Sequence, residues 1–431
     1  FAKAGKNNIL RACDIKRIVD VVTARSTVEK FSKVVSRDDI RANDYNLNIP
    51  RYVDSSEKAE SWDIFASMFG GIPDSELREL HPYWDAFPGL KDALFASDDG
   101  SYCRLNVAEL KSALRSHPSV ASFLSRYESA FHNFDELLRA ELLGKMQTLN
   151  TAQEESVLSD AIFSRLAGIP LIDRYSAYQL LDDEWGRIAV DLEIIQTEGF
   201  AATKQVDPNM VSKKKDGKDQ EVQEGWAGHV IPFALVQETL LPDALAALTA
   251  LETRLSEISG EYESLQEDLS EDDKEHDLVN EGKDAFVPAE VKKALKAEET
   301  EPQTLAVLKK ADALITEEKT LRRQIKTDSA ALHLKTKATI EGLSDDAVLE
   351  LLQKKWIVPI VGSLRSLPDT VIADFTNKLE AICKKYETTF AEVEEEIADT
   401  ERSLVSLLDE LTGSEFDMRG LAEFKKLLGG E

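Results

Sequence analysis

Residues 241–269 read LPDALAALTALETRLSEISGEYESLQEDL, and this stretch decides the fold class of the 431-residue chain. Large apolar side chains recur at every seventh position, at Leu241, Leu248, Leu255, Tyr262 and Leu269. The companion positions of the same heptads hold Ala244, Leu251, Ile258 and Leu265. A heptad seam sustained in this way predicts a coiled-coil helix about 45 Å long, at about 1.5 Å per residue.

A second segment continues the heptad pattern, with Glu318 and Asp328 interrupting a seam formed by Val307, Ala311, Leu314, Leu321, Ile325 and Leu332. The simplest arrangement is an antiparallel helical hairpin. Its connection would be the acidic stretch 267–284, which can bury little and is expected to be solvated or disordered. Heptads do not specify their partner, so the seam either binds another protein or packs within the chain. The candidate partner-binding residues of the hairpin are Leu248, Leu251, Leu255, Ile258 and Leu265.

Helical periodicity also covers most of the remaining chain. Residues 120–146 predict one long amphipathic helix, and residues 371–428 predict a further helical unit. One face of that unit is formed by Val371, Phe375, Leu379, Ile382 and Tyr386, of which Phe375, Leu379 and Ile382 are candidate partner-binding residues. The helical pattern weakens over 194–236, which predicts short strands around an exposed turn at 213–218, the second strand being 229–233. We therefore predict a mainly α fold of helical bundles and a coiled-coil hairpin, with a few short strands near the N-terminus and around 190–235.

Composition narrows the class of protein. The net charge of −28 argues against a general nucleic-acid-binding surface. The apolar runs are far shorter than a membrane span, so no membrane partner is expected. The three cysteines, Cys13, Cys103 and Cys383, lie far apart, which suits the reducing cytoplasm and gives no metal-ligand spacing. The histidines show no ligand spacing either, and we predict no metal site.

The first 51 residues differ from the rest in charge, because they hold 11 Lys/Arg against 6 Asp/Glu, a balance of +5. Asp14 is expected to cap a helix whose apolar face is Ile15, Ile18, Val19 and Val22. Tyr45, Leu47 and Ile49 alternate with asparagines, which predicts a half-buried strand that ends at Pro50.

Residues 43–54 read Asn-Asp-Tyr-Asn-Leu-Asn-Ile-Pro-Arg-Tyr-Val-Asp and are the most specific motif in the chain. With the turn Lys3-Ala4-Gly5-Lys6-Asn7-Asn8 and the segment Glu29-Lys30-Phe31-Ser32, they resemble the end of the catalytic domain in the modification (M) subunit of type I restriction-modification systems. Three later motifs keep the order of the long-tailed members of that family, namely Tyr83-Trp84-Asp85-Ala86-Phe87-Pro88-Gly89-Leu90, Pro170-Leu171-Ile172-Asp173-Arg174-Tyr175 and Lys354-Lys355-Trp356.

The resemblance implies an organisation and a set of partners. Residues 1–60 would be the tail of the methyltransferase domain, 61–240 a helical middle domain with a small β or loop insertion, 241–335 the hairpin and 336–431 a C-terminal helical region. The implied partners are the specificity (S) and restriction (R) subunits, and DNA through the assembled complex. The basic end would lie near DNA, so the candidate phosphate contacts are Lys3, Lys6, Arg11, Arg17 and Arg51. The alternative is a solvated face without a partner.

The chemistry of adenine-N6 methylation is missing from the sequence. That family binds S-adenosylmethionine with a Gly-containing loop after a strand, and the flipped adenine with an Asn/Asp-Pro-Pro-aromatic motif. No Pro-Pro pair occurs, and Phe69-Gly70-Gly71 is a glycine pair more typical of a loop than of a cofactor cradle. We predict no catalytic residue and no bound cofactor here, with S-adenosylmethionine expected for the intact parent protein. Because the chain opens at Phe1, we expect it to be a fragment.

Two functions remain open. The first is the non-catalytic C-terminal region of a type I M subunit, which docks the specificity subunit and supports DNA binding for adenine-N6 methylation. The second is a free-standing coiled-coil scaffold or protein-interaction module unrelated to DNA. The fragment alone is not expected to be an enzyme, whereas the intact parent protein is expected to resemble a site-specific DNA (adenine-N6) methyltransferase.

Overall fold

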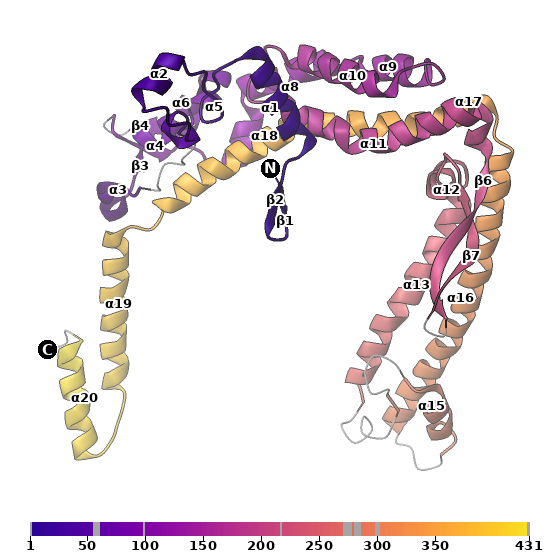
Figure 1. The fold of residues 1–431 in the computed structure, drawn as a ribbon. Coiled ribbons are helices and arrows are strands. Elements are labelled where there is room, and N and C mark those ends of the chain that lie inside the picture. The colour runs from indigo at the N-terminus through magenta and orange to yellow at the C-terminus, as the bar shows by residue number, and fades with distance from the viewer. Residues whose placement is uncertain are drawn as a thin grey trace. The chain divides into compact units, whose positions relative to one another are not determined.

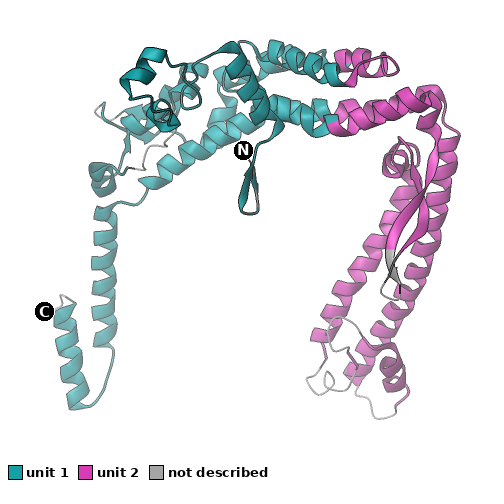
Figure 2. Cartoon of the chain, in the orientation of Figure 1, with its two compact units in different colours: residues 1–135, 152–185, 360–431 teal, residues 136–151, 186–359 magenta. Residues whose placement is uncertain are grey.

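The computed structural model describes residues 2–54, 61–97, 100–215, 218–269, 278–279, 286–297 and 302–428. The described chain is mainly helical with a few antiparallel strands, which confirms the predicted fold class (Figure 1). It divides into two compact units. Unit 1 contains residues 1–135, 152–185 and 360–431, and unit 2 contains residues 136–151 and 186–359 (Figure 2).

The first part of the chain alternates short helices with short strands. In chain order these are β1 (Ala2–Ala4), β2 (Asn7–Ile9), α1 (Ala12–Ala24), α2 (Arg37–Ala42), a 3-10 turn (Ile49–Arg51), α3 (Ile64–Phe69), β3 (Ile72–Pro73), α4 (Asp74–Glu79), α5 (His81–Ala86), α6 (Leu90–Leu94), β4 (Phe95–Ser97), β5 (Tyr102–Leu105), α7 (Leu110–Ser116) and α8 (Pro118–Phe131). The strands β1 and β2 form a hairpin, and β3, β5 and β4 form a small antiparallel sheet in that order.

Longer helices make up the second part. They are α9 (Phe134–Leu138), a π-helical segment (Arg139–Leu143), α10 (Thr151–Leu166), α11 (Arg174–Glu198), a 3-10 turn (Phe200–Lys204), β6 (Val206–Lys215), β7 (Lys218–Gly228), α12 (Phe233–Leu240), α13 (Pro242–Glu267), α15 (Pro288–Ala294), α16 (Pro302–Glu341), α17 (Asp345–Leu352), a second π-helical segment (Gln353–Ile357), α18 (Val358–Lys385), α19 (Phe390–Asp409) and α20 (Glu415–Leu427).

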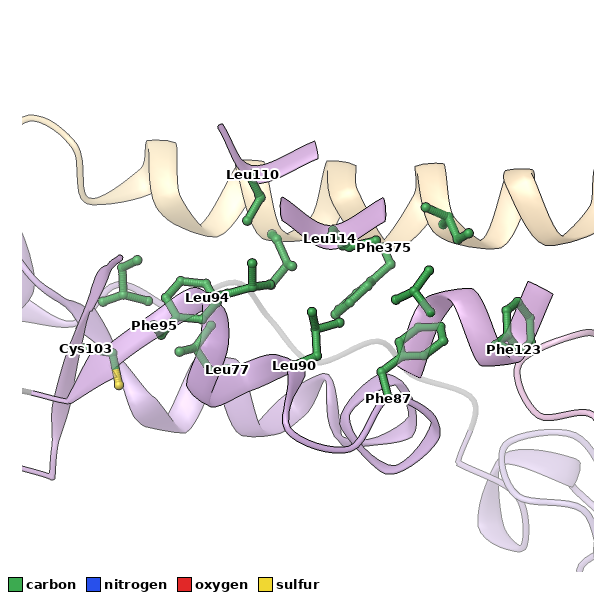
Figure 3. Packing of buried hydrophobic residues seen from close by; sticks show 14 residues of the cluster. Leu77, Phe87, Leu90, Leu94, Phe95, Cys103, Leu110, Leu114, Phe123 and Phe375 are labelled. Atoms are coloured by element: carbon green, nitrogen blue, oxygen red, sulfur yellow. The ribbon is translucent and has the colours of Figure 1, made fainter. Parts of the chain in front are cut away.

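The core of unit 1 packs α18 against the short elements between α4 and α8 (Figure 3). Phe375 of α18 is fully buried there and contacts aromatic rings from two sides. Its ring stacks on Tyr83 at a centroid distance of 4.3 Å and meets Trp84 edge-on at 5.0 Å. Leu379 is also fully buried in this cluster, and Ile382 packs against it. The predicted apolar face of α18 is therefore occupied within unit 1.

A proline interrupts the hydrogen bonding of α18. Pro368 lacks an N–H group, so the carbonyl oxygen of Leu364, four residues earlier, loses its helical donor. The hydroxyl group of the buried Tyr127 on α8 donates to that oxygen at 2.7 Å. Burial raises the pKa of Tyr127 above its ordinary value. The Tyr127 hydroxyl group therefore replaces the hydrogen-bond donor that Pro368 lacks.

Replacing Tyr127 with phenylalanine is expected to lower the free energy of unfolding by about 1–3 kcal/mol, because it leaves a buried carbonyl without a donor. Chemical denaturation followed by circular dichroism measures the change. Tyr45 is the matched control, because its hydroxyl group meets Arg41 on the surface and Tyr45→Phe is expected to change stability by less than about 0.5 kcal/mol. Equal stability of Tyr127→Phe and the parent chain would contradict this account.

Unit 2 contains the predicted helical hairpin, in which α13 packs along α16. The pairing is antiparallel, because Tyr262 reaches Glu318 whereas the earlier Leu255 lies beside the later Ile325. Glu318, which interrupts the heptads, accepts a hydrogen bond of 2.8 Å from the Tyr262 hydroxyl group. Arg254 of α13 fixes the register with a bidentate contact to Glu317, at 2.7 and 3.0 Å. Of the predicted acidic connection 267–284, most lies outside the described residues.

The strands of unit 2 differ in part from the prediction. The paired β6 and β7 confirm strands in this region, but they extend through Lys215 and from Lys218, so most of the predicted turn at 213–218 is strand. The predicted strand at 229–233 is wrong. β7 ends at Gly228, and the backbone N–H of His229 donates to Gln205. Val230 and Ile231 are then both buried, instead of alternating between two faces, and Pro232 caps α12. Consecutive burial of two apolar residues fits a core-filling turn and not a half-exposed strand.

The prediction of one continuous helix over 120–146 is also wrong. α8 ends at Phe131, and α9 and the first π-helical segment follow after a break at His132 and Asn133. Both residues are weaker helix formers than the leucines and glutamates around them. The break allows Phe131 and Phe134 to be buried together, with their rings edge-on at 5.6 Å.

A buried polar cluster lies where α11 meets the second π-helical segment. Asp191 of α11 accepts a hydrogen bond from the Trp356 indole nitrogen at 2.7 Å. The same carboxylate forms an ion pair of 2.5 Å with Lys355. Lys355 also donates to the carbonyl oxygen of Val230 at 2.5 Å. These bonds satisfy the polar groups that the π-helical segment brings into unit 2.

Candidate functional site

The N-terminal segment carries the candidate site, and its first helix is capped differently from the prediction. Arg11 is the N-cap of α1, whereas Asp14 occupies the third helical position. The Asp14 carboxylate accepts from the Arg11 backbone N–H at 2.9 Å and from its guanidinium group at 3.2 Å. These hydrogen bonds hold the pKa of Asp14 well below its ordinary value. Arg11 is therefore already engaged by a carboxylate.

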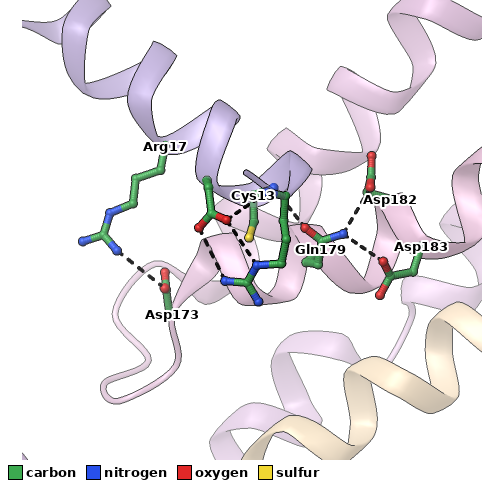
Figure 4. Close-up of polar contacts among 8 residues, drawn as sticks. Cys13, Arg17, Asp173, Gln179, Asp182 and Asp183 are labelled. Carbon is green, nitrogen blue, oxygen red and sulfur yellow. Dashed lines mark hydrogen bonds and ion pairs between the residues drawn. The ribbon is translucent and has the colours of Figure 1, made fainter. Parts of the chain in front are cut away.

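Polar contacts dock α1 on the start of α11 (Figure 4). The backbone N–H of the buried Cys13 donates to the Gln179 side chain at 3.0 Å, and Gln179 donates in turn to Asp182 and Asp183. Burial raises the pKa of the Cys13 thiol. Arg17 lies 3.9 Å from the carboxylate of Asp173. Its guanidinium group also sits over the Phe31 ring, at 4.4 Å.

The motif at 43–54 folds as a compact turn, and the predicted strand over Tyr45, Leu47 and Ile49 is wrong. Asp44 and Tyr45 both adopt positive φ angles, 54° and 57°, which an extended strand excludes. The side chain of Asn46 accepts from the Asn48 backbone N–H at 2.9 Å, a local bond typical of asparagine turns. The hydroxyl group of Tyr52 closes the turn by donating to the Asn46 carbonyl oxygen at 2.6 Å.

The five candidate DNA contacts are not equivalent in this structure. Lys3 on β1, Lys6 in the hairpin turn and Arg51 on the 3-10 turn are exposed. Arg11 and Arg17 are paired with Asp14 and Asp173 instead. Whether any of them contacts phosphate stays a prediction.

The apolar residues of the same segment are turned outward. The predicted apolar face of α1 is exposed at all four positions, most of all at Val22, which is 69% accessible. The motif turn adds Tyr45, Leu47 and Ile49, each about two-thirds accessible or more (67%, 71% and 71%). Of the described residues before Asp54, only Cys13 and Val21 are buried. This segment therefore presents an apolar surface that no described residue of unit 1 covers.

Two other kinds of site, a cofactor cradle at Gly70-Gly71 and a metal site, can be compared with the structure. A Cβ atom at Gly70 would lie 3.3 Å from Thr389, and one at Gly71 would lie 3.4 Å from Tyr102. The space beside both glycines is therefore filled by the chain itself, which does not fit a cofactor cradle. Across the described residues, no group of three or more His, Cys, Asp or Glu side chains is placed to hold a metal ion.

The candidate partner-binding residues lie mostly inside the two units. Ile258 and Leu265 are buried in the hairpin core with Leu251 and Leu255 packed against it, and Leu248 is buried as well. Phe375, Leu379 and Ile382 belong to the core of unit 1. Each set therefore packs within its own unit.

A further apolar surface lies on α19 and α20 and on Leu411 between them, and none of its residues is among the site residues predicted from the sequence. We call it the terminal apolar face, and it consists of Phe390, Val393, Ile397, Leu404, Leu407 and Leu411 with Phe416, Met418, Phe424 and Leu427. All ten side chains are exposed, and Phe416 and Leu427 are more than four-fifths accessible (82% and 83%). The signal that could have identified this surface is the helical spacing from Val393 to Leu411 within an acidic helix.

Among the described residues, no single helix combines the length and apolar composition of a membrane span. The pair α12 and α13 passes that test only together, and it is bent by 104°.

Comparison with known proteins identifies the N-terminal segment. A family model described as N-6 DNA Methylase matches residues 1–61. The chain is 38% identical over 64 residues to the type I restriction enzyme MpnII methylase subunit of Mycoplasma pneumoniae, which is 15% of this chain and 12% of that subunit. It is 45% identical over 51 residues to the MjaVII methylase subunit of Methanocaldococcus jannaschii, 12% of this chain and 9% of that subunit.

No solved structure matches the chain. The family match at residues 1–61 includes α1, the motif turn and the exposed apolar surface described above, and ends before α3. The chain thus spans only a small part of the relatives that it matches, 12% and 9% of their lengths. Residues 1–61 are accordingly related to the N-6 DNA methylases, with similarity to the methylase subunits of type I restriction enzymes.

Proposed function

We propose that this chain is the non-catalytic C-terminal region of a type I restriction-modification M subunit, which holds the specificity subunit through its terminal helices. The single observation that carries the proposal is the terminal apolar face, in a chain whose first 61 residues are related to N-6 DNA methylases. The methylation of adenine N6, with S-adenosylmethionine as cofactor, would be performed by the rest of such an enzyme. The restriction subunit and DNA would join through the assembled complex, in the cytoplasm.

The size of the terminal apolar face supports a protein partner. The part on α19, from Phe390 to Leu407, extends over about 26 Å at about 1.5 Å per residue. Apolar patches of this extent are uncommon on free proteins and mark interaction sites. Each large apolar side chain that becomes fully buried stabilises a complex by about 1.5–3 kcal/mol before the costs of association.

Charge specifies what kind of helix fits this surface. α19 is strongly acidic, and its apolar stripe is bordered by Glu394 and Glu401 on one side and by Glu396 on the other. In helical pairs the residues beside the apolar seam select partners by charge. A helical partner with an apolar stripe flanked by lysine or arginine therefore complements α19, and the proposal assigns such helices to the specificity subunit.

The N-terminal segment supports the other half of the proposal. The exposed face of α1 and the motif turn form a second uncovered apolar surface, within the residues that match the methylase family. A methylase domain seated on that surface would bury it. The N-terminal end of the described sequence would then contact the methylase domain, and the C-terminal end would bind the specificity subunit.

The test is a titration of the full chain with the specificity subunit encoded beside it. The double variant Ile397→Asp with Leu404→Asp is expected to weaken binding at least about tenfold, because charges replace apolar anchors at the interface. The control is Ala398→Asp with Ser406→Asp, which adds the same charge to exposed positions of α19 away from the apolar stripe and is expected to bind as the parent chain does. Deleting 371–431 is unsuitable, because it also removes Phe375 and Leu379 from the core.

Two results would overturn the proposal. Equal weakening by the control variant would show a general charge effect and no apolar docking. Absence of binding between the parent chain and the specificity subunit would instead favour a free-standing coiled-coil scaffold.

A further inference from the structure

The long helix α16 carries a stripe of cations on one face. Lys319, Arg322, Arg323, Lys326 and Lys337 fall within an arc of about 100° when about 3.6 residues make one turn. We call this set the cationic stripe, and it extends over about 27 Å at about 1.5 Å per residue. From residue 319 to 337 the only acidic residue is Asp328, which lies on the opposite side of the helix.

Most of the stripe is free to meet a ligand. Lys319, Arg323 and Lys326 are exposed, and none of them forms an ion pair with a described residue. Arg322 pairs with Glu318 at 2.7 Å and stays two-thirds accessible (66%). Lys337 lies 3.7 Å from Glu341. Three uncompensated cations on two successive turns are unusual in a chain with 80 acidic residues and 52 basic ones.

The acidic residues elsewhere in the chain do not cancel the positive potential at the cationic stripe. At physiological salt, charges further apart than about 8 Å are largely screened from one another. The balance that a ligand meets is therefore that of the surface beside it. The stripe itself holds five lysines and arginines and no acid, while Glu318 and Glu341 pair with Arg322 and Lys337 and Glu224 lines the hollow beside it.

The stripe continues into a hollow between α16 and β7, with a volume of about 540 Å³. Arg322, Lys326 and His333 line it from the helix, and Glu224 and Gly225 line it from the strand. The His333 ring accepts from the Trp226 backbone N–H at 2.8 Å, which holds the strand on the helix. Gly225, at a φ of 74°, lies so close that a Cβ atom there would be 2.6 Å from the ring.

Lys337 is fixed at the far end of the same surface. Its ammonium group lies over the Trp226 ring at 3.5 Å from the centroid. The contact orders a side chain that would otherwise lose rotamer freedom on binding a ligand. The stripe thus has one end that is exposed and without ion pairs among the described residues, and another end held by the contact of Lys337 with Trp226 on β7.

We propose that the cationic stripe of α16 binds the sugar-phosphate backbone of duplex DNA. A row of lysines and arginines along about 27 Å matches a linear polyanion better than a compact anion, because each cation can meet a different phosphate. Phosphate contacts made by such a row position a protein on DNA without reading its sequence. The choice of DNA over an acidic polypeptide rests on the proposed function. The stripe is separate from the terminal apolar face, which is assigned to the specificity subunit.

The experiment measures binding of the full chain to a fluorescent random-sequence duplex over a range of salt concentrations. The triple variant Lys319→Ala, Arg323→Ala and Lys326→Ala is expected to reduce the slope of log affinity against log salt by about 2–3, because each phosphate contact contributes about 0.9. The matched control is Lys309→Ala, Lys310→Ala and Lys335→Ala. It removes the same charge from exposed positions of the same helix, outside the stripe, and is expected to leave the slope unchanged.

Three results would overturn the proposal: no binding of the parent chain to the duplex, an equal loss in the control variant, or competition by polyglutamate as strong as that by DNA. Inorganic phosphate at the same ionic strength is expected not to displace the duplex. Titration of the stripe variant with the specificity subunit separates the two proposals. Unchanged docking with lost DNA binding supports the stripe, whereas lost docking in the Ile397 and Leu404 variant concerns the terminal apolar face alone.

Discussion

Phe375→Ala is expected to lower the free energy of unfolding by about 3–5 kcal/mol, the range of large aromatic deletions in a packed core. Phe375 has no accessible surface and touches the rings of Tyr83, Trp84 and Phe87. Its removal leaves a cavity among rigid aromatic side chains, which relax little. Urea denaturation of the parent and variant chains measures the change as a shift in midpoint.

The control for this prediction is Phe390→Ala, which removes the same side chain from the exposed terminal apolar face. It is expected to change stability by less than about 0.5 kcal/mol. If both variants unfolded at the same urea concentration, the packing of α18 described here would be contradicted. The two variants also distinguish a core residue from a partner-binding residue, because a partner can contact the exposed Phe390 but not the buried Phe375 while unit 1 stays folded.

Asp191→Ala is expected to destabilise unit 2 by about 3–5 kcal/mol, because removing one member of a buried ion pair leaves the other uncompensated. Only 8% of the Asp191 side chain is accessible, and 19% of that of Lys355. The substitution also removes the acceptor of the buried Trp356 indole N–H. Thermal and urea denaturation measure the loss of stability.

A double variant distinguishes the ion pair from simple packing. Asp191→Ala combined with Lys355→Met removes both charges, and we expect it to recover part of the lost stability. Lys354→Ala serves as the control, since Lys354 pairs with Glu350 on the surface at 3.6 Å and is expected to contribute less than about 1 kcal/mol. No recovery in the double variant would show that the unpaired lysine is not the cause.

The helical hairpin could be predicted from sequence because its heptads report directly on a buried seam. Leu248, Ile258 and Leu265 are buried, as the spacing indicates. Glu318 interrupts the heptad pattern but still lies at the seam, because its carboxylate accepts a hydrogen bond from the Tyr262 hydroxyl group. Pattern and packing agree here because a long helix repeats one geometry over many turns.

The motif turn shows why short alternating patterns are less informative. Tyr45, Leu47 and Ile49 have the spacing of a strand, yet positive φ angles at Asp44 and Tyr45 fold the segment into a turn. Alternation over five residues does not distinguish the two, because a turn can also direct every second side chain outward. The deciding interactions are local hydrogen bonds of asparagine side chains, which periodicity does not report.

The candidate site shows a second limit of sequence reasoning. Periodicity finds the apolar faces of α18 and α19 equally well, but it does not say what covers each of them. In the structure the α18 face is filled by Tyr83, Trp84 and Phe87, whereas the α19 face is exposed. The difference depends on contacts between residues almost three hundred positions apart, such as the hydrogen bond of 2.7 Å from Tyr83 to Asp374. Such contacts are visible only in the folded chain.

The π-helical segment at 353–357 bears on how relatives of this chain can differ in length. A π turn holds one residue more than an α turn, so the continuous helix from Asp345 to Lys385 already accommodates one insertion. Loss of the exposed Lys354 would restore a regular helix, keep both flanking faces in phase and retain Lys355 and Trp356, which contact the buried Asp191. Loss of one residue between Val358 and Ile372 would turn Phe375 by about 100° away from its aromatic neighbours. A single-residue deletion in this helix is therefore expected to be tolerated at Lys354 and to disrupt the core of unit 1 when it lies beyond the π turn.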